Sequence, residues 1–215
     1  MWKRVTFPQI SSYTYKSKYE LWRVPTVLIE YKNIILRDMK KEDIVDYVRW
    51  FTSETEWANT DAPWEPIDTN DEKESIYWSK YYSSIKDISD DICRSRFEIE
   101  FNNKHVGWVS SYYIDEKYEY LDKINDGQTV YRAIGIDICD VSMWGHGIGE
   151  KALRAFINYY FDNGNDELYT QTWSGNVRMI RLAKKLGFAE CSCNKSTREV
   201  CGQKYDALTF RLKKL

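Results

Sequence analysis

Apolar and polar positions alternate most regularly between Val130 and Ile138, where isoleucines occupy three of the even-numbered positions. A period of two sends successive side chains to opposite faces of a pleated strand. The pattern therefore predicts a strand that ends near Cys139. Asp137 falls on the face of this strand opposite to the isoleucines.

A helical period follows this strand. Ile148, Ala152, Phe156 and Tyr160 recur at intervals of four residues, and apolar positions at this spacing form one face of an amphipathic helix. We predict a helix from about Ile148 to Phe161. The glycine-containing polar segment that comes next is typical of a helix end.

Three glycines lie between the strand and the helix. Gly145, Gly147 and Gly149 fall at alternate positions, and without a Cβ their backbone amides are free to turn toward one point. The first turn of the helix adds unpaired N–H groups and the positive end of its dipole. This combination predicts an anion site, with pyrophosphate as the best candidate and a simple flexible turn as the alternative. No P-loop fingerprint is present, and Glu150 replaces the third glycine of the dinucleotide fingerprint.

The rest of the pattern predicts a mixed α/β protein. Thr69 and Glu72 match a capping box that starts a helix. Strands and helices mix without strict alternation, so we expect an α+β type mixed sheet with helices on both faces. The predicted strands are 34–37, 96–101, 106–114, 168–173, 188–194 and 203–212, the other helices are 42–51, 69–83 and 176–186, and a polar insertion spans 115–128.

Length and composition suit one domain with an extension. The chain has 215 residues, of which 43% are hydrophobic and 30% charged, and this is an ordinary globular composition. Residues 1–33 are rich in aromatic side chains and precede the patterned region, so we assign the domain to residues 34–215. The extension packs either on this domain or on a second copy, and the latter case implies a homodimer.

Charge and cysteine content exclude several classes of protein. A formal net charge of −2 without a basic stripe argues against a nucleic-acid partner. No apolar run or signal core is present, so we expect a cytoplasmic protein without a membrane partner. The cysteines are odd in number and lack CxxC spacing, which predicts free thiols and no metal site; they are Cys93, Cys139, Cys191, Cys193 and Cys201.

Two sequence blocks resemble the GNAT superfamily of N-acetyltransferases. WGHGIGEKALRAFINYYF, at 144–161, is similar to the acetyl-CoA loop and helix of that superfamily, and NVRMIRLAKKLGF, at 176–188, is similar to its next helix. The form of the loop is most similar to the RimJ/RimL-like branch, and the resemblance covers about residues 34–212. It implies a GNAT-like sheet and direct transfer of an acetyl group from acetyl-CoA to a primary amine.

The resemblance also implies a donor site. The loop would hold the pyrophosphate, the strand edge from Ile136 to Cys139, with Ile138 and Cys139 as the binding residues, would run beside the pantetheine, and Asn176 would contact the pantetheine or cap its helix. Two positions depart from the superfamily: Trp144 replaces a Gln or Arg, and Ala183 replaces the usual Tyr acid, for which a water or a hydroxyl such as that of Tyr205 must substitute. The expected loop residues are Trp144, Gly145, His146, Gly147, Ile148 and Gly149.

Asp137 is the candidate base, as in the similar Ile-Asp sequence of aminoglycoside 6′-N-acetyltransferases. An Asp pKa of ~3.9 is too low for an efficient base unless burial raises it. The alternatives are that Asp137 acts through a water, that it holds an ammonium, or that it is simply solvated. Glu98 and Glu100, on the polar positions of their predicted strand, are alternatives, and Glu98 is also a candidate for binding the acceptor. A backbone N–H near Ile138 or Cys139 would meet the oxyanion.

An acidic, aromatic loop precedes the 69–83 helix and is implied to wall the acceptor pocket. Trp64 would cover an acceptor, while Asp61 and Glu65 would attract a cationic amine; in the alternative, Trp57 and Trp64 fill the core. The acceptor is either a protein N-terminus, as the RimJ/RimL-like resemblance implies, or a small amine such as an aminoglycoside or polyamine. A silent acyl-CoA-binding module is the remaining alternative.

Overall fold

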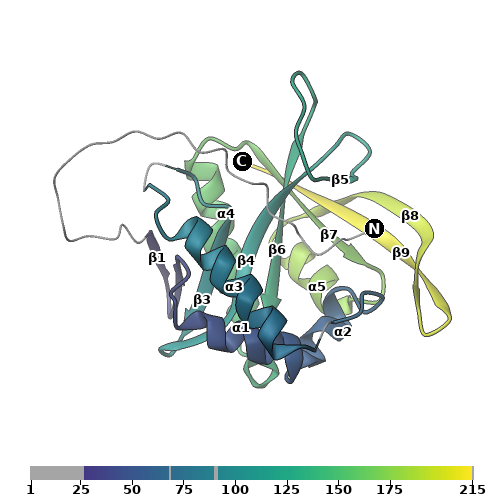
Figure 1. Ribbon diagram of the computed structural model, residues 1–215. Coiled ribbons are helices and arrows are strands. Elements are labelled where there is room, and N and C mark those ends of the chain that lie inside the picture. Colours follow the sequence, from purple (N-terminus) through teal and green to yellow (C-terminus); the bar gives the residue numbers. More distant parts are fainter. Residues whose placement is uncertain (1–26, 68, 90–91, 215) are drawn as a thin grey trace.

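The computed structural model describes residues 27–67, 69–89 and 92–214. A nine-stranded sheet runs through it in the order β1-β2-β3-β4-β6-β7-β9-β8, and β5 pairs with β4 (Figure 1). The strands are β1 Leu28–Tyr31, β2 Ile34–Arg37, β3 Arg96–Phe101, β4 Lys104–Ile114, β5 Tyr120–Leu121, β6 Tyr131–Ile138, β7 Glu167–Trp173, β8 Ala189–Val200 and β9 Gln203–Lys213.

Helices cover both faces of the sheet, as predicted. The described helices are α1 Asp43–Thr52, η1 Thr55–Trp57, α2 Ala58–Asp61, α3 Asp71–Ile85, η2 Val141–Met143, α4 Ile148–Asp162 and α5 Val177–Lys185. On one face, Phe156 of α4 and Ala183 of α5 belong to a core with Ile134 of the sheet. On the other, the aromatic residues of α1 and α3 pack on Trp108 of β4. Each face therefore has its own core.

The sheet has an opening between the parallel strands β6 and β7. The parallel strands β6 and β7 are in register only at Ala133 and Tyr169, and the Thr170 hydroxyl donates to the Ile134 carbonyl at 2.8 Å beside this point. β7 instead pairs with β9 along its whole length. Toward their C-terminal ends, β6 and β7 separate and line a cavity. We call this separation the splay.

Two local predictions need correction. The alternation over 96–101 implies that the polar side chains of β3 face solvent, but α1 and α3 cover that face and leave Glu98 only 1% exposed. The N-cap of α3 lies one residue after the predicted cap: the Asn70 side chain, not that of Thr69, accepts the Lys73 N–H at 2.9 Å. The sequence pattern did not reveal the layer above β3, because that layer comes from distant segments.

The end of the N-terminal extension forms part of the sheet. Residues 1–26 lie outside the described residues, and the part from 27 to 33 contributes β1, which pairs antiparallel with β2 at the sheet edge. Among the described residues, no helix is both long enough and apolar enough to span a membrane.

Candidate active site

A large cavity of about 1430 Å³ opens at the splay. Its walls come from β6 and β7, from the glycine loop with α4 and α5, and from the segment 57–67 that follows α1. Glycine backbone and basic side chains line one end, and aromatic and acidic side chains line the other. We call these the donor end and the acceptor end.

The donor end is built on the start of α4. Gly147 is the N-cap of this 15-residue helix with φ +71°, and Gly145 has φ +84°. L-residues rarely adopt these conformations. A Cβ at either glycine would meet no atom within 4 Å, so the space before the helix is open. The unpaired N–H groups of a helix start suit an anion there.

Basic side chains from α5 complete the donor end. Arg178, Arg181 and Lys185 line the cavity, at the i, i+3 and i+7 spacing of one helix face. The Arg178 guanidinium lies 4.1 Å from the Trp144 ring centroid, and the Trp144 indole N–H donates to the Ile138 carbonyl at 2.8 Å. Trp144 is thus held against the strand, and Arg178 brings a positive charge to it. These three residues were not among the predicted donor residues, although their spacing on one helix face is a usable signal.

Most of the expected donor residues line the cavity, but two do not. The lining includes Ile138, Trp144, Gly145, Gly147, Ile148, Gly149 and Asn176. His146 is exposed beside the loop, with Nδ1 3.2 Å from the Trp144 carbonyl oxygen. Cys139 is 1% exposed, and its N–H donates to the Val106 carbonyl at 2.9 Å. That N–H is therefore not free to meet an oxyanion, whereas the Ile138 N–H points to the opposite edge, toward the splay, because N–H directions alternate along a strand.

Asn176 links the two ends of the cavity. Its side-chain oxygen accepts the Met179 N–H at 3.0 Å and so caps α5. Its side-chain nitrogen donates to the Thr60 carbonyl at 2.7 Å, and the Trp173 indole N–H donates to the same oxygen at 3.0 Å. The capping role expected for Asn176 is present, and it also ties the acceptor loop to β7 and α5.

The acceptor end has aromatic walls. Trp57 is only 6% exposed and belongs to the core on that face, yet it also lines the cavity. Trp64 is half-buried, packs edge-on against Trp173 at 5.9 Å, and carries the Arg198 guanidinium 5.1 Å from its ring. Trp57 thus belongs to the core, as one alternative proposed, whereas the role of Trp64 in covering an acceptor stays a prediction.

Asp137 lies at the meeting point of the two ends. It pairs with Trp108 across β4 and β6 and lines the cavity, with Asp61 and Glu65 on the facing loop. Burial, followed by the negative charge of Asp61, raises the pKa of Asp137 well above its ordinary value, although Arg96 opposes the shift. Within the described part of the chain, neither Asp61 nor Asp137 forms an ion pair.

Asp61 shows the same tendency. Its carboxylate has accessible surface because it opens into the cavity, yet the protein around the cavity replaces much of the surrounding water. This burial, together with the charge of Glu65, raises the pKa of Asp61. Burial also raises the pKa of Glu65. A cation that enters the acceptor end would therefore stabilise the charged forms of these acids.

Glu98, an expected acceptor residue, does not line the cavity. It accepts hydrogen bonds from the Tyr47 hydroxyl at 2.5 Å and the Arg96 Nε at 3.3 Å, and lies 2.9 Å from His105 Nε2. Burial alone would raise the pKa of Glu98, but the charge of Arg96 and the hydrogen bond with His105 lower it to about 2. Glu98 is an internal anion of a buried network, and Glu100 is the ion-pair partner of Arg37 at 2.7 Å.

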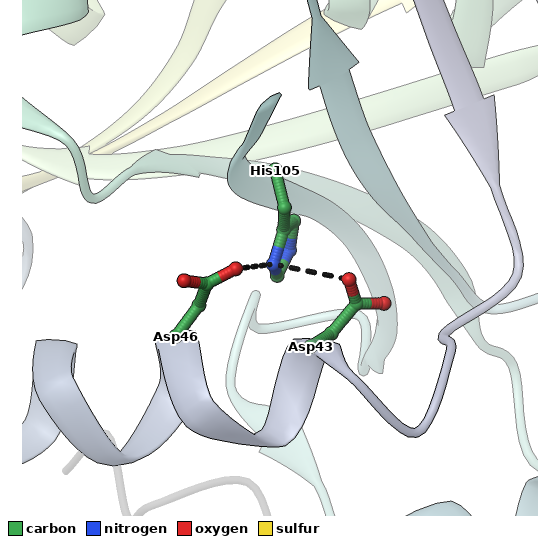
Figure 2. A group of neighbouring side chains, drawn as sticks. All are labelled: Asp43, Asp46 and His105. Atoms are coloured by element: carbon green, nitrogen blue, oxygen red, sulfur yellow. Dashed lines mark hydrogen bonds and ion pairs between the residues drawn. The ribbon is translucent and has the colours of Figure 1, made fainter. Parts of the chain in front are cut away.

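His105 lies at the centre of this network, which sequence spacing did not reveal. Figure 2 shows Asp43 and Asp46 on α1 pointing toward its ring, with Nδ1 3.0 Å from Asp46 and 3.5 Å from Asp43. Burial opposes a charge on His105, yet the hydrogen bonds with Asp46 and Glu98 raise its pKa to about 9. Arg37 binds both oxygens of Asp43, at 2.7 and 2.8 Å. Arg37 and charged His105 thus balance these two aspartates.

The folded state is expected to lose stability with rising pH because of His105. Since its pKa rises from 6.5 to about 9 on folding, its stabilisation is complete below pH 6.5 and is lost as pH increases through 9, by roughly 3 kcal/mol in total. Urea unfolding at several pH values measures this loss. The change should be absent from His105→Gln, and the difference between the two proteins removes the contribution of Asp61 and Asp137. A pH-independent difference would contradict a charged His105.

Ala183 and Tyr205 are the positions considered for a general acid, and neither lines the cavity. Ala183 is fully buried under the sheet. The Tyr205 hydroxyl donates to the Gln203 side chain at 2.8 Å, and its ring packs on Trp173 outside the cavity lining. Two other tyrosines, Tyr77 and Tyr112, do line the cavity.

Solved structures of acetyltransferases share this fold. Mycobacterium smegmatis RimJ in complex with CoA-disulfide matches with a TM-score of 0.65 and 17% identity, over 88% of this chain and 88% of that one. RimL, a ribosomal L7/L12 alpha-N-protein acetyltransferase in complex with CoA, matches at 0.65 and 16%, over 87% and 98%. The putative acetyltransferase yncA from Salmonella typhimurium, with its cofactor acetyl-CoA, matches at 0.59 and 18%, over 85% and 94%.

The sequence itself identifies the family. Residues 33–189 match the acetyltransferase (GNAT) domain. This region contains β2 through α5 and therefore the glycine loop, Asp137, the splay and the acidic loop. The chain belongs to the GNAT family of acetyltransferases.

Proposed function

We propose that this acetyltransferase moves the acetyl group of acetyl-CoA directly to a positively charged primary amine, and that Asp137 receives the amine. The position of Asp137 carries the proposal, because this carboxylate lies where the donor end and the acceptor end of one cavity meet. A direct transfer requires both substrates to be held together at one point.

The donor end suits the phosphates of acetyl-CoA. The glycine loop and the start of α4 would accept the pyrophosphate, while Arg178 and Arg181 supply positive charge nearby. Lys185 is paired with Glu150 at 2.6 Å. The edge of β6 at the splay leaves room for an extended pantetheine to pair with backbone, as an added strand does. The structures of RimL and yncA, which contain CoA and acetyl-CoA, support this assignment.

Asp137 has the properties that a base for an ammonium group needs. Because its pKa is raised, Asp137 takes up a proton near physiological pH more readily than an ordinary carboxylate does. It accepts one proton from the ammonium and passes it to solvent. The neutral nitrogen then forms the bond to the acetyl carbon, the carbon–sulfur bond breaks, and the second nitrogen proton ends on the CoA thiol. The Ile138 N–H, which points to the splay, is our candidate donor to the oxyanion.

The amine belongs either to a small cationic molecule or to a protein N-terminus. Acids and aromatic rings at the acceptor end favour a cation in both cases. A silent acyl-CoA-binding module is the alternative that Ala183 favours, since this residue supplies no acid.

Thermal unfolding with acetyl-CoA, with pantetheine as the control, tests the donor site. A ligand at 100 times its Kd adds ~2.7 kcal/mol, which for a chain of this size corresponds to a shift of several degrees. A shift with acetyl-CoA but not with pantetheine supports phosphate binding, and mass spectrometry of mixed amines then detects transfer. Binding without transfer to any amine would favour the silent module, and no shift would contradict the donor site.

Gly147→Leu is expected to abolish most of the acetyl-CoA shift. Its Cβ meets no protein atom, so the side chain would project into the space assigned to the pyrophosphate. Gly127→Leu is the matched control, because Gly127 has a similar φ of +75° and open surroundings outside the cavity. Both variants should lose about 1 kcal/mol of stability from backbone strain. An equal acetyl-CoA shift in both variants would contradict the placement of the phosphates.

A further inference from the structure

We infer that Arg96 recognises a carbonyl oxygen next to the reacting amine, so that the acceptor is an α-aminoacyl compound such as an amino acid amide or a peptide N-terminus. The inference rests on the proposed function and narrows its substrate class. It assigns a role to a side chain that neither the donor site nor Asp137 explains.

The strand register places Arg96 and Asp137 on one face of the sheet. Arg96 pairs with Ser110, and Ser110 pairs with Gly135. One step along the strands, Glu98, Trp108 and Asp137 form the parallel row. Ser110 and Gly135 are small, and a Cβ on Gly135 would meet no atom within 4 Å. The sheet thus forms an open floor bounded by Arg96 on one side and Asp137 on the other.

Arg96 has hydrogen-bonding capacity left over. Its Nε donates to Glu98 at 3.3 Å and its Nη2 donates to the Tyr47 hydroxyl, while its Nη1 makes no hydrogen bond to any described residue. The side chain is only 7% exposed, yet it lines the cavity. A guanidinium carries five N–H donors in a fixed fork. The unused donors are therefore those at the cavity.

The surrounding side chains hold this guanidinium in one orientation. It lies 4.4 Å from the Trp108 ring and 5.4 Å from the Trp78 ring. Behind it, Glu98 is fixed by Tyr47 and by His105, which is in turn held by Asp46. A donor that is fixed before binding loses little entropy when it meets an oxygen. The buried network thus fixes the direction of the Arg96 guanidinium, in addition to stabilising the fold.

The charge balance selects the kind of oxygen. Glu98 already neutralises Arg96, and the nearby acids Asp61, Glu65 and Asp137 would repel a carboxylate in the same cavity. A neutral carbonyl avoids this repulsion and still accepts the N–H. A polyamine would bring a second positive charge toward the guanidinium instead. In the substrate that fits best, the ammonium lies between Asp61 and Asp137, and the neighbouring carbonyl points toward Arg96. The ammonium then faces negative charges, and the guanidinium faces a neutral acceptor.

The test compares L-alaninamide with isopropylamine, which lacks the carbonyl, and with spermidine. In the wild type, kcat/KM should be highest for L-alaninamide. Arg96→Lys should lower kcat/KM for L-alaninamide by about 10 to 100 fold, the loss of a hydrogen bond to a charged group, and should change the value for isopropylamine by less than about 3 fold. Comparing each amine with itself across variants removes differences in amine basicity.

Two further variants keep the result interpretable. Arg96→Met with Glu98→Gln removes both charges together, so that no buried charge is left unpaired. Arg132→Lys is the matched control, since Arg132, like Arg96, lies against two aromatic rings, here those of Tyr113 and Tyr160 at 4.6 Å each, but does not line the cavity. An unchanged thermal shift with acetyl-CoA shows that each variant retains the donor site.

An equal loss for all three amines would mean that Arg96 is only structural and would overturn the inference. A wild-type preference for spermidine would overturn it as well, although the proposed acetyl transfer would stand. Failure to acetylate any amine would overturn both. Only a loss specific to L-alaninamide supports the recognition of a carbonyl.

Discussion

Asp137→Asn is expected to lower kcat/KM for amines by about 10² to 10⁴ fold, the usual contribution of a general base. Asparagine keeps the size of the side chain but removes both the negative charge and the ability to accept a proton. Asp137 has no ion-pair partner among the described residues, so the fold does not depend on its charge. Acetyl-CoA should therefore shift the unfolding temperature of the variant as much as that of the wild type.

The pH profile separates this role from a purely structural one. Because the pKa of Asp137 is raised, kcat/KM of the wild type should increase with pH through that pKa, and the variant should lose this limb. Asp140→Asn is the matched control: Asp140 lies three residues away, caps η2 through Ser142, and does not line the cavity. Full activity of Asp137→Asn with an unchanged profile would exclude Asp137 as the base.

Gly107→Ala is expected to destabilise the fold by about 3 kcal/mol or more, and to lower the unfolding temperature by roughly 10 °C. A Cβ at Gly107 would lie 1.9 Å from the Asp137 carbonyl oxygen, and the residue has φ +152°. The colliding atom belongs to the backbone of β6, so no rotamer change relieves the contact. The two strands must separate at the residue that we assign as the base.

Gly135→Ala is the control for this change. Gly135 lies on the neighbouring strand in ordinary extended conformation, and an added Cβ meets no atom within 4 Å. Its unfolding temperature should therefore match that of the wild type. Calorimetry of both variants gives the comparison, and a Gly107→Ala protein as stable as Gly135→Ala would show that β4 and β6 adjust more easily than close packing implies.

The sequence predicted those parts of the site that are local in the chain. The strand, glycine loop and helix around Asp137 follow from two periodicities within one short segment, and the structure confirms β6, α4 and the mixed sheet. The Asn176 cap is equally local, because its side chain acts three residues ahead.

The parts that the sequence did not predict depend on register between distant strands. Glu98 reads as a polar strand position, yet Tyr47 and His105 reach it from α1 and β4 and bury it. Gly107 reads as an ordinary strand glycine, and only its pairing with β6 shows why a side chain has no room there. No pattern within a single element contains either fact.

The Thr60 carbonyl, which accepts from both Trp173 and Asn176, has a mechanical consequence. Thr60 belongs to the acceptor loop, so its two hydrogen bonds hold that loop to the β7 side of the splay, where β6 and β7 share a single register pair. Movement of the acceptor loop must therefore either displace the start of α5 or break these two hydrogen bonds. The width of the acceptor end is therefore coupled to the position of α5 at the donor end.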